Sequence, residues 1–424
     1  MHHFHYRDGR LHCEDVPLDT IADQVGTPCY VYSTATLTRH YNVLADAFDG
    51  SKYLIAYSVK ACGNIGVAKT LAGLGAGADV VSGGELYKAL HAGIPASRIV
   101  FSGVGKTRDE LKMALDAGIH QFNVESLPEM ERLSQIAADM GKVAPVAFRV
   151  NPHVDAGGHA NISTGGAEHK FGIAWHEAGT FYQRARDLPG IDPVGVDVHI
   201  GSQITDISPM RIAFEKVVTL VKQLRAEGFA ISRMDLGGGL GIPYKPTDNP
   251  DTPAQYAQMI REVKQGVDIE LILEPGRMIA GNAGVMLATV EYVKHRDGRS
   301  FVILDSGMND LMRPALYDAH HEILPLAEAD SDTPLETVDI VGPVCESTDR
   351  FAKARSMPPL KQDDRIAFMS AGAYGAVLSS QYNARPIAAE VIVNGDVFDV
   401  IRRRPTYEEI VALESAPHWL TQQE

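Results

Sequence analysis

A lysine at the end of a short apolar run is the residue in this sequence best placed for covalent chemistry. The run Lys52-Tyr-Leu-Ile-Ala-Tyr-Ser-Val-Lys60 is rich in aromatic and aliphatic residues, and Ala-Cys-Gly63 follows it, as expected of a buried strand that turns at a glycine. Burial of the strand end favours the neutral amine of Lys60, which can form a Schiff base with a carbonyl compound. The alternative is a surface lysine that happens to follow a core strand.

A glycine-rich segment after a second apolar run suits a phosphate. In Asp235-Leu-Gly-Gly-Gly239, the consecutive residues Gly237, Gly238 and Gly239 leave their backbone N–H groups unobstructed, so that these groups can converge on an anion. The alternative is a tight turn that needs glycine only for its own backbone.

Two other apolar runs end in groups that suit a planar, phosphorylated cofactor. In Glu274-Pro-Gly276-Arg277 the carboxylate can accept a hydrogen bond from a protonated pyridine nitrogen, and the amides of Gly276 and Arg277 can extend a phosphate cradle. The alternative is a strand-end turn with a surface ion pair. In the run that ends at His199, the imidazole could stack on a ring and Ser202 could donate to a phosphate, although a lone histidine in an apolar strand is more often a satisfied core residue. Together with the lysine, these are the parts of a pyridoxal 5'-phosphate (PLP) site.

Three motifs further along the chain carry charged or reactive side chains. They are Arg313-Pro-Ala-Leu-Tyr317, Val344-Cys345-Glu346-Ser347 and Ala371-Gly-Ala-Tyr374-Gly-Ala. Each alone passes as ordinary sequence of a β domain. A fourth motif, Gly103-Val-Gly-Lys106-Thr107, resembles the end of a phosphate-binding P-loop, but Val100 stands where the leading glycine belongs. We interpret it as a loop in which Thr107 caps the next helix.

The elements that must position these residues alternate regularly. Strands are predicted at 52–59, 78–81, 98–102, 120–124, 144–150, 193–199, 231–236 and 269–274, with helices between them at 64–74, 84–92, 107–117, 127–140, 209–227 and 253–265. This alternation is typical of a (β/α)8 TIM-type barrel, and a doubly wound sheet also alternates. The barrel is favoured because polar or reactive residues follow many strands, namely Lys60, Asp79, Ser102, Arg149, His199, Gly237 and Glu274.

The rest of the chain lacks the regular alternation of strands and helices. Residues 1–33 are predicted to be mostly extended, with a helix at 18–24 and a strand at 27–32. After residue 280, strands are predicted at 285–294, 300–305, 338–344, 365–370 and 388–401, followed by a helix at 407–414. We therefore expect a PLP-binding barrel at 34–280 and a mostly-β domain at 281–424, whose sheet the segment 1–33 joins.

Composition narrows the class of partner. A chain of 424 residues with 45% hydrophobic and 22% charged residues is typical of a globular protein of two domains. A formal net charge of -15 argues against nucleic acid, and the absence of a long apolar run argues against a membrane span. The four cysteines form no CxxC pair, which predicts a reducing compartment, the cytoplasm. The His-rich start has no second cluster to complete a ligand set, so no metal site is predicted.

As a set, the motifs resemble the meso-diaminopimelate decarboxylases, which are fold-type III PLP decarboxylases like the ornithine and arginine decarboxylases. The resemblance runs from Gly26-Thr-Pro to the end of the β domain. Its motifs are Tyr57-Ser-Val-Lys60-Ala, Gly77-Ala-Asp79-Val-Val-Ser, His159-Ala-Asn-Ile-Ser163-Thr-Gly, His169-Lys-Phe-Gly172, His199-Ile-Gly-Ser202-Gln-Ile, Gly237-Gly-Gly239, Glu274-Pro-Gly-Arg277, Arg313-Pro-Ala-Leu-Tyr317, Gly342-Pro-Val-Cys345-Glu346-Ser347 and Ala371-Gly-Ala-Tyr374-Gly.

The resemblance implies a role for each matched residue. Lys60 would be the Schiff-base lysine, His199 would stack on the PLP ring, Glu274 would contact the pyridine nitrogen and Cys345 would be the proton donor. The other expected cofactor contacts are Asp79, Ser202, Gly237, Gly238, Gly239, Gly276, Arg277 and Tyr374, and the expected substrate contacts are Arg277, Arg313, Tyr317, Glu346 and Tyr374. The family is a homodimer in which Cys345, Glu346 and Tyr374 reach the site across the interface. The chain departs from the family at Ser58 and Cys62, usually alanine and asparagine, and at Gly157-Gly158.

The expected reaction is decarboxylation of meso-2,6-diaminopimelate to L-lysine and CO2, the last step of lysine biosynthesis by the diaminopimelate pathway. Arg277 and Arg313 suit a distal carboxylate and Glu346 suits a distal ammonium, and diaminopimelate carries both groups. Two buried arginines beside the lone distal ammonium of ornithine would be repulsive. The alternatives are a decarboxylase of ornithine, arginine or carboxynorspermidine, a racemase of the same fold, and a catalytically silent PLP-binding homologue.

Overall fold

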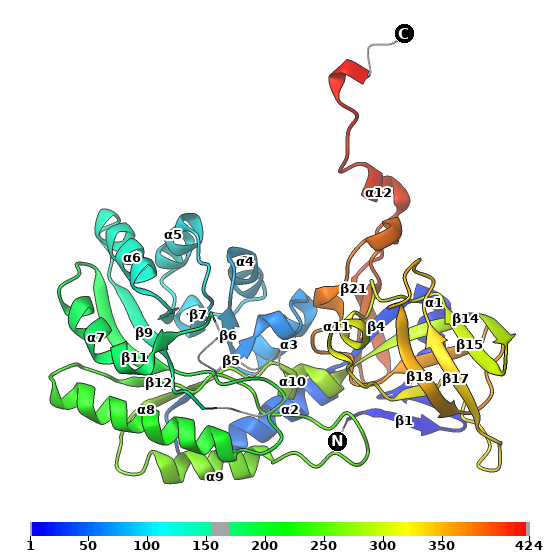
Figure 1. Ribbon diagram of the computed structural model, residues 1–424, viewed down its shortest axis with the longest axis horizontal. Helices are drawn as coiled ribbons and strands as arrows, with labels where there is room; N and C mark the ends of the chain where they lie inside the picture. The colour runs from blue at the N-terminus through cyan, green and yellow to red at the C-terminus, as the bar shows by residue number, and fades with distance from the viewer. Residues whose placement is uncertain (1, 155–169, 421–424) are drawn as a thin grey trace. The chain divides into compact units, whose positions relative to one another are not determined.

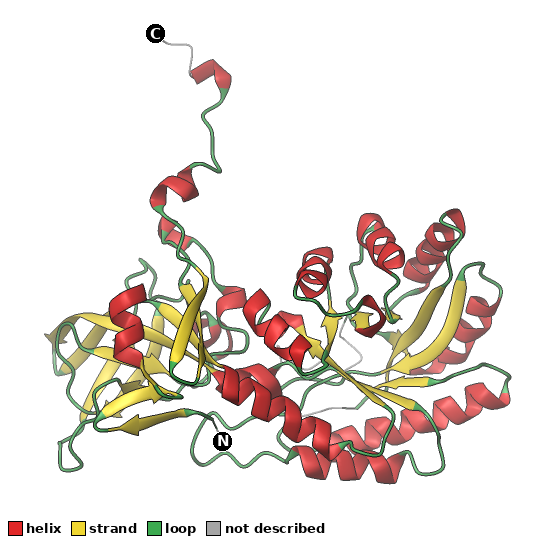
Figure 2. Cartoon of the chain, turned by 180° about the vertical axis from the view of Figure 1, so that it is seen from behind, coloured by secondary structure: helices red, strands yellow, loops and turns green. Residues whose placement is uncertain are grey.

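The computed structural model describes residues 2–154 and 170–420, which divide into two compact units. One unit comprises residues 34–283, and the other comprises residues 2–33 together with 284–424. Helices alternate with strands in the first unit, whereas strands predominate in the second (Figures 1 and 2).

The first unit is a closed barrel of eight parallel strands. They are β5 (Tyr53–Ser58), β6 (Gly77–Val80), β7 (Ile99–Phe101), β8 (Gln121–Val124), β9 (Ala144–Asn151), β11 (Ile191–Asp197), β12 (Arg233–Asp235) and β13 (Glu270–Leu273). The ring closes because β13 pairs with β5 and β8 pairs with β9. A further short strand, β10 (Ile173–Ala174), pairs with β9. All eight predicted strands are present, which confirms the predicted barrel.

Helices connect the strands and lie outside the ring (Figure 1). They are α2 (Thr34–Ala47), α3 (Ile65–Gly73), α4 (Gly83–His91), α5 (Arg108–Ala117), α6 (Leu127–Asp139), α7 (Ala178–Arg186), α8 (Ser208–Ala226) and α9 (Pro253–Val263). Thr107 caps α5 in a capping box with Glu110, as its interpretation as a helix cap predicted. Helix α7 was not predicted, because it starts without a side-chain cap and buries only three of its nine residues.

The interior of the barrel changes from apolar to polar along the strands. Alternate residues of a strand face the same side, and Leu54, Ala56, Val100 and Ile272 form one buried apolar cluster. Near the carboxyl ends of the strands, the register pairs Ser58 with Asp79, and Asp197 with both Arg149 and Asp235. All five of these polar residues are buried. The barrel mouth is therefore lined by buried polar groups, which must find hydrogen-bond partners.

The second unit is built on a sheet in the order β18-β17-β15-β14-β4-β20-β21. Its strands are β4 (Cys29–Ser33), β14 (Gly284–Arg296), β15 (Arg299–Leu304), β17 (Glu336–Val341), β18 (Arg350–Met357), β20 (Ala389–Asn394) and β21 (Val397–Arg402), with β16 (Ile323–Pro325) and β19 (Arg365–Phe368) paired off this path. Strand β4 pairs with β14 on one side and β20 on the other, and all five of its residues are buried. The prediction of a mostly-β domain that includes the N-terminal segment is confirmed.

The N-terminal segment also forms a small sheet of its own. Strands β1 (Phe4–Arg7), β2 (Arg10–Cys13) and β3 (Val16–Pro17) precede helix α1 (Leu18–Val25). Their buried side chains join the core of the second unit, where Leu11, Leu18 and Ile21 pack in one cluster with Val31 and Val391. This cluster ties the first 33 residues to strands that lie far along the chain.

Some predicted elements of the second unit are wrong. The run at 388–401 is two antiparallel strands, β20 and β21, which meet at a turn containing Gly395, whose φ is 63°. Strands β16 and β18 were not predicted. Strand β18 is at the edge of the sheet and carries charged side chains. Because of these charges it lacks the apolar pattern by which a strand is predicted, and the same charges oppose pairing of the sheet edge with another chain. Helix α12 (Tyr407–Val411) is shorter than predicted.

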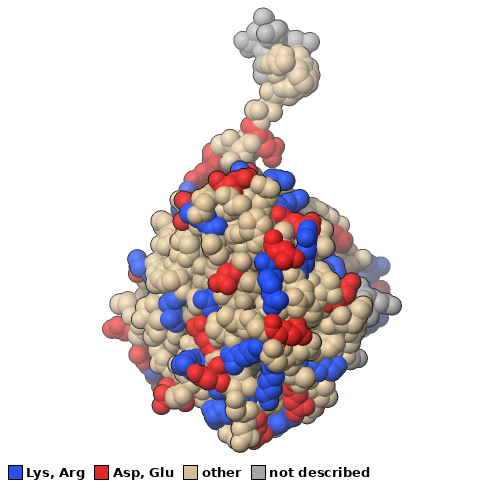
Figure 3. Space-filling model, turned by 90° about the vertical axis from the view of Figure 1, so that its left-hand side faces the viewer, with Lys and Arg blue, Asp and Glu red and all other residues tan. Residues whose placement is uncertain are grey.

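Over the face drawn in Figure 3, basic and acidic side chains are interspersed and form no patch of one sign. Among the described residues, none of the helices combines the length and the apolar character that crossing a bilayer requires.

Candidate active site

Lys60 lies in the short turn that follows β5, at the mouth of the barrel. Its Nζ atom is 2.7 Å from Asp79 Oδ2, and the Asp79 side chain is fully buried whereas that of Lys60 is 34% exposed. Ser58 Oγ donates to the same oxygen at 2.7 Å. Asp79 thereby fixes the amine at the mouth.

His199 follows β11 and presents a neutral imidazole. Desolvation first, and then the positive charges of Arg149 and Lys60, lower the pKa of His199 well below its usual value. Gly238 N donates to His199 Nδ1 at 3.2 Å, so the proton of the neutral ring is on Nε2. A neutral ring with a fixed tautomer suits stacking on a planar group.

The glycine-rich segment follows β12 and leaves no room for side chains. A Cβ atom at Gly238 would lie 2.2 Å from the backbone oxygen of Glu274, and Gly239 has a φ of 111°. Gly237 N donates to Asp235 Oδ1 at 3.0 Å, and Gly238 N donates to His199 Nδ1. Two of the three N–H groups predicted to converge on a phosphate therefore donate within the protein, and their glycines shape the loop.

Arg277 begins the short helix α10 (Arg277–Ala280) after β13 and is buried. Its Nη1 donates to Tyr244 Oη at 2.6 Å and its Nη2 donates to Ser202 Oγ at 3.1 Å. Ser202 and Arg277, which were predicted from separate motifs, therefore meet at the mouth. Tyr244 was not predicted, since nothing in its local sequence marks it as more than a loop tyrosine.

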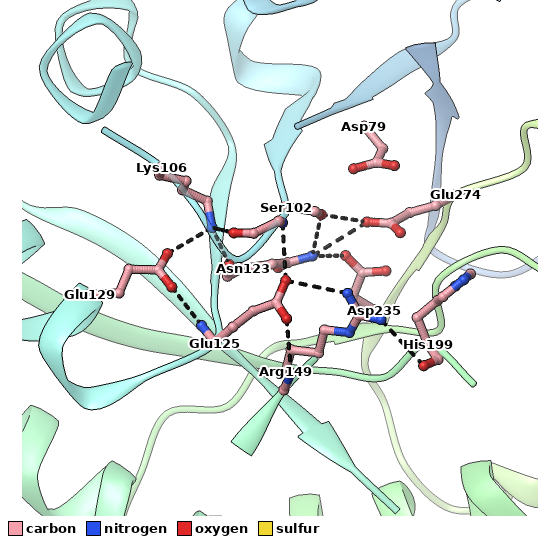
Figure 4. Close-up of polar contacts among 12 residues, drawn as sticks. Asp79, Ser102, Lys106, Asn123, Glu125, Glu129, Arg149, His199, Asp235 and Glu274 are labelled. Carbon is pink, nitrogen blue, oxygen red and sulfur yellow. Dashed lines mark hydrogen bonds and ion pairs between the residues drawn. The ribbon is translucent and has the colours of Figure 1, made fainter. Parts of the chain in front are cut away.

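Glu274 directly follows β13 and lies among other carboxyl groups (Figure 4). Ser102 Oγ lies 3.1 Å from Glu274 Oε1, and Asn123 Nδ2 lies 2.9 Å from Asp235 Oδ2. Burial, followed by repulsion from Asp235 and Asp79, raises the pKa of Glu274 well above its usual value. Asn123 was missed from the sequence, although the alternation Gln121-Phe-Asn123-Val places two polar residues on one face of a buried strand.

The remaining predicted residues belong to the second unit. Arg313 and Tyr317 are the first and last residues of helix α11 (Arg313–Tyr317), and Arg313 is buried. Arg313 Nη1 is 3.0 Å from His321 Nε2, and His321 Nδ1 is 2.8 Å from the carbonyl oxygen of Met369. If Nδ1 carries the proton, Nε2 can accept from the arginine. His321 was not predicted.

Cys345 and Glu346 are exposed, in a segment tied to neighbouring loops of the second unit. Cys345 N donates to Asn383 Oδ1 at 3.3 Å, and Tyr382 Oη donates to Glu346 Oε2 at 3.0 Å. Hydrogen bonds from Thr348 and then Tyr382 lower the pKa of Glu346, which is therefore ionised at neutral pH. Tyr374 is partly buried and has a φ of 57°, a conformation that costs energy for a residue other than glycine and is common at functional sites.

The structure thus gathers the predicted residues into two sets, one in each unit. Lys60, Asp79, His199, Ser202, Gly237, Gly238, Gly239, Glu274, Gly276 and Arg277 lie at the carboxyl ends of the barrel strands, whereas Arg313, Tyr317, Cys345, Glu346 and Tyr374 lie in the second unit. The motif at 159–165 and His169 lie outside the described residues.

Comparison with known proteins identifies the class. Residues 34–281 match the family model described as "Pyridoxal-dependent decarboxylase, pyridoxal binding domain". The chain is 47% identical over 420 residues to the diaminopimelate decarboxylase of Haemophilus influenzae, which covers 98% of this chain and 100% of that protein. It is 48% identical over 415 residues to that of Pseudomonas aeruginosa, covering 98% and 99%.

A solved structure shares the whole fold. The crystal structure of diaminopimelate decarboxylase from M. jannaschii in complex with L-lysine is 37% identical, covers 98% of both chains and superposes with a TM-score of 0.93. The family model and these relatives place the chain in the class of pyridoxal-dependent decarboxylases. Within that class, the chain belongs to the diaminopimelate decarboxylase family.

Proposed function

We propose that this protein decarboxylates meso-2,6-diaminopimelate to L-lysine and CO2 with PLP as cofactor, the last step of lysine biosynthesis by the diaminopimelate pathway. One observation carries the proposal: Lys60, 2.7 Å from a buried carboxylate at the barrel mouth, belongs to a chain that matches diaminopimelate decarboxylases over 98% of its length. The complex of the M. jannaschii relative with L-lysine supports lysine as the product.

The residues at the barrel mouth fit PLP by their chemistry. Lys60 supplies an amine for the aldehyde, Glu274 a carboxyl group for the pyridine nitrogen and His199 a neutral ring for stacking. Ser202, the backbone of Gly239 and Gly276, and Arg277 supply donors for the phosphate. PLP, when bound, supplies the electron sink for loss of the α-carboxylate.

The chain's own groups then hold protons and orient the reactants. Asp79 holds the Lys60 amine at the mouth through a 2.7 Å contact. Glu274 would keep a proton at the pyridine nitrogen of bound PLP. Ser58 donates to Asp79 and keeps that carboxylate in place. Asp79 and Ser58 therefore fix the position of the Lys60 amine before substrate arrives.

We propose that Arg277, Arg313, Tyr317, Glu346 and Tyr374 bind the substrate. Buried guanidinium groups suit the distal carboxylate, and the ionised Glu346 suits the distal ammonium. Ornithine has no distal carboxylate, and its distal ammonium would be repelled by the buried arginines, so diaminopimelate is the preferred substrate.

We propose further that the enzyme is a homodimer with shared sites, in which Cys345 of the partner subunit donates the proton that replaces the lost carboxylate. The exposure of Cys345 and Glu346 on their own chain supports this arrangement, because a general acid needs a site that excludes water. The four cysteines are all free thiols, which supports a reducing, cytoplasmic location.

A direct assay tests the function. The purified protein with PLP is incubated with meso-diaminopimelate, ornithine or arginine, and both CO2 and the amine product are measured. We expect CO2 and lysine from diaminopimelate and far less product from the others. Release of no CO2 with a change of configuration would instead favour a racemase, and no turnover with Lys60 covalently labelled by borohydride would favour a silent homologue.

A further inference from the structure

A chain of hydrogen bonds inside the barrel leads from Gln121 to Glu274. Figure 4 shows the part from Asn123 through Ser102 to Glu274. Gln121 Nε2 donates to Asn123 Oδ1 at 2.7 Å, which fixes the orientation of the Asn123 amide. The NH2 group of that amide lies 3.1 Å from Ser102 Oγ and 2.9 Å from Asp235 Oδ2. Ser102 Oγ lies in turn 3.1 Å from Glu274 Oε1. All five side chains are buried.

One arrangement satisfies the donors and acceptors of this chain. Asn123 has two N–H bonds, of which one donates to Ser102 Oγ and the other to Asp235 Oδ2. Because Ser102 Oγ accepts from Asn123, its own hydrogen is directed at Glu274 Oε1. Asn123 Nδ2 is also 3.4 Å from the same Glu274 oxygen, and this longer contact further restrains the carboxyl group. One oxygen of Glu274 is thus fixed by neutral donors.

Glu274 needs such donors because of the charges around it. The charged groups that act on Glu274 are Asp235 of β12, Asp79 of β6, Asp197 of β11 and Lys60 after β5. Those that act on its neighbour Asp197 are Asp235, Arg149 of β9, Glu125 after β8 and Asp79. Burial and mutual repulsion raise the pKa of Asp197 well above its usual value and the pKa of Asp235 to about 7. The same causes push Glu274 toward its neutral form, in which it could not hold a pyridinium. Donors to the ionised form oppose this effect.

We infer that Ser102 and Asn123 are positioning residues that hold Glu274 ionised and in place, and so keep the pyridine nitrogen of bound PLP protonated. The inference rests on the proposed function, since it concerns the same cofactor site. Both residues act through Glu274. A merely structural role, filling the barrel interior, would affect folding stability but not the protonation of the ring nitrogen.

The test loads the enzyme with PLP that is isotope-labelled at the ring nitrogen and records its nitrogen NMR signal. Ser102→Ala and Asn123→Ala are compared with the parent enzyme and with Ser134→Ala. Ser134 is a buried serine of α6 that donates to the Pro189 carbonyl oxygen at 2.7 Å, so its loss is the same chemical change away from the site. We expect the signal to move toward unprotonated pyridine in both site variants and PLP affinity to fall about tenfold, the effect of one hydrogen bond to a charged group. Ser134→Ala should leave both unchanged.

An unchanged nitrogen signal in both site variants would overturn the inference, even if their kcat fell. If Ser102→Ala fails to fold, Ser102→Cys keeps the shape with only a weak donor and carries the same test. The parent enzyme separates the two proposals. If it binds no PLP, or borohydride does not label Lys60, the proposed function fails; if it behaves as expected and the variants match it, only the role of Ser102 and Asn123 fails.

Discussion

At the scale of single residues, the site is prearranged by side chains that do not themselves take part in bond breaking. Arg277 is the clearest case, because Tyr244 and Ser202 hold two of its nitrogens at 2.6 Å and 3.1 Å. A guanidinium whose plane is already fixed loses less conformational entropy when it binds a carboxylate. Prearrangement of this kind predicts effects on substrate affinity from residues outside direct contact.

Tyr244→Phe removes the hydroxyl group that accepts from Arg277 and leaves the ring, whose centroid is 5.8 Å from Arg277 Cζ. We expect KM for diaminopimelate to rise about tenfold, with smaller changes in kcat and in PLP affinity. Steady-state kinetics and a PLP titration measure these quantities. Tyr182→Phe is the control, since it removes a buried hydroxyl that donates to the Gly195 carbonyl oxygen at 2.6 Å. An equal KM in the two variants would contradict the prediction.

Arg313→Ala tests the recognition of the distal carboxylate. The arginine is buried and held by His321, and its removal deletes the charged hydrogen bond that we propose it makes to the substrate. We expect KM for diaminopimelate to rise about thirtyfold, the equivalent of about 2 kcal/mol, with little change in the absorbance of bound PLP. Arg350→Ala, a change at a partly exposed arginine 3.8 Å from Asp339, should leave KM unaltered. Unchanged affinity in Arg313→Ala would rule out the carboxylate role.

Asp235 links the buried carboxyl groups to the pH dependence of stability. Its pKa is raised to about 7, chiefly by burial. Between about pH 4 and about pH 7 the folded protein therefore keeps a proton that the unfolded chain releases, and the free energy of unfolding falls as pH rises through this window. Asp235→Asn abolishes that loss, so the stability of the variant relative to the parent should increase from about pH 4 to about pH 7 and then level off. Thermal unfolding of the cofactor-free protein measures this, and a difference independent of pH would refute it.

At the scale of elements, a buried ion pair joins the loop after β7 to helix α6. Lys106 Nζ donates to Glu129 Oε1 and to the carbonyl oxygens of Gly103 and Asn123, each at 2.7 Å. We expect Lys106→Met to lower the free energy of unfolding by about 3–5 kcal/mol, because Glu129 becomes an unpaired buried charge. The double variant with Glu129→Leu should recover part of the loss. Denaturant titration distinguishes these outcomes, and a single variant as stable as the double one would contradict the prediction.

The loop at 103–107 shows what a sequence pattern can predict and what it cannot. Its glycines resemble a phosphate-binding motif, yet Lys106 is buried against Glu129, and Thr107 caps α5 as predicted. The eight barrel strands were predictable because each is a short apolar run bounded by turn residues. Strands β20 and β21 were predicted as one strand because both are apolar. The pair Asn394-Gly395 at their junction is itself a turn signal.

The site was predictable only in part, for a related reason. Residues that follow a barrel strand must face one mouth, so Lys60, His199 and Glu274 could be grouped from their positions alone. The link from Asn123 of β8 through Ser102 to Glu274 reaches the residues that directly follow β7 and β13, and it depends on the closure of the ring. Side-chain pairs across a barrel leave no local trace in the sequence.

At the scale of the whole molecule, the groups assigned to chemistry are divided between the units. Lys60 belongs to the barrel, whereas Cys345 belongs to the β unit and is exposed on its own chain. A homodimer with shared sites would bring the lysine of one subunit together with Cys345 of the partner subunit. Each catalytic site would then need two chains.

Subunit mixing tests this arrangement. Lys60→Ala and Cys345→Ala are each expected to be nearly inactive alone. When the two variants exchange subunits in equal amounts, half of the dimers are mixed, and a mixed dimer with shared sites has one intact site that combines the remaining lysine with the remaining cysteine. About a quarter of the parent activity should therefore return. If both residues instead act within one chain, every site in the mixed dimer lacks one of them, and activity stays at the level of the separate variants. Two different affinity tags isolate the mixed dimer, so that absent activity cannot be attributed to failed exchange.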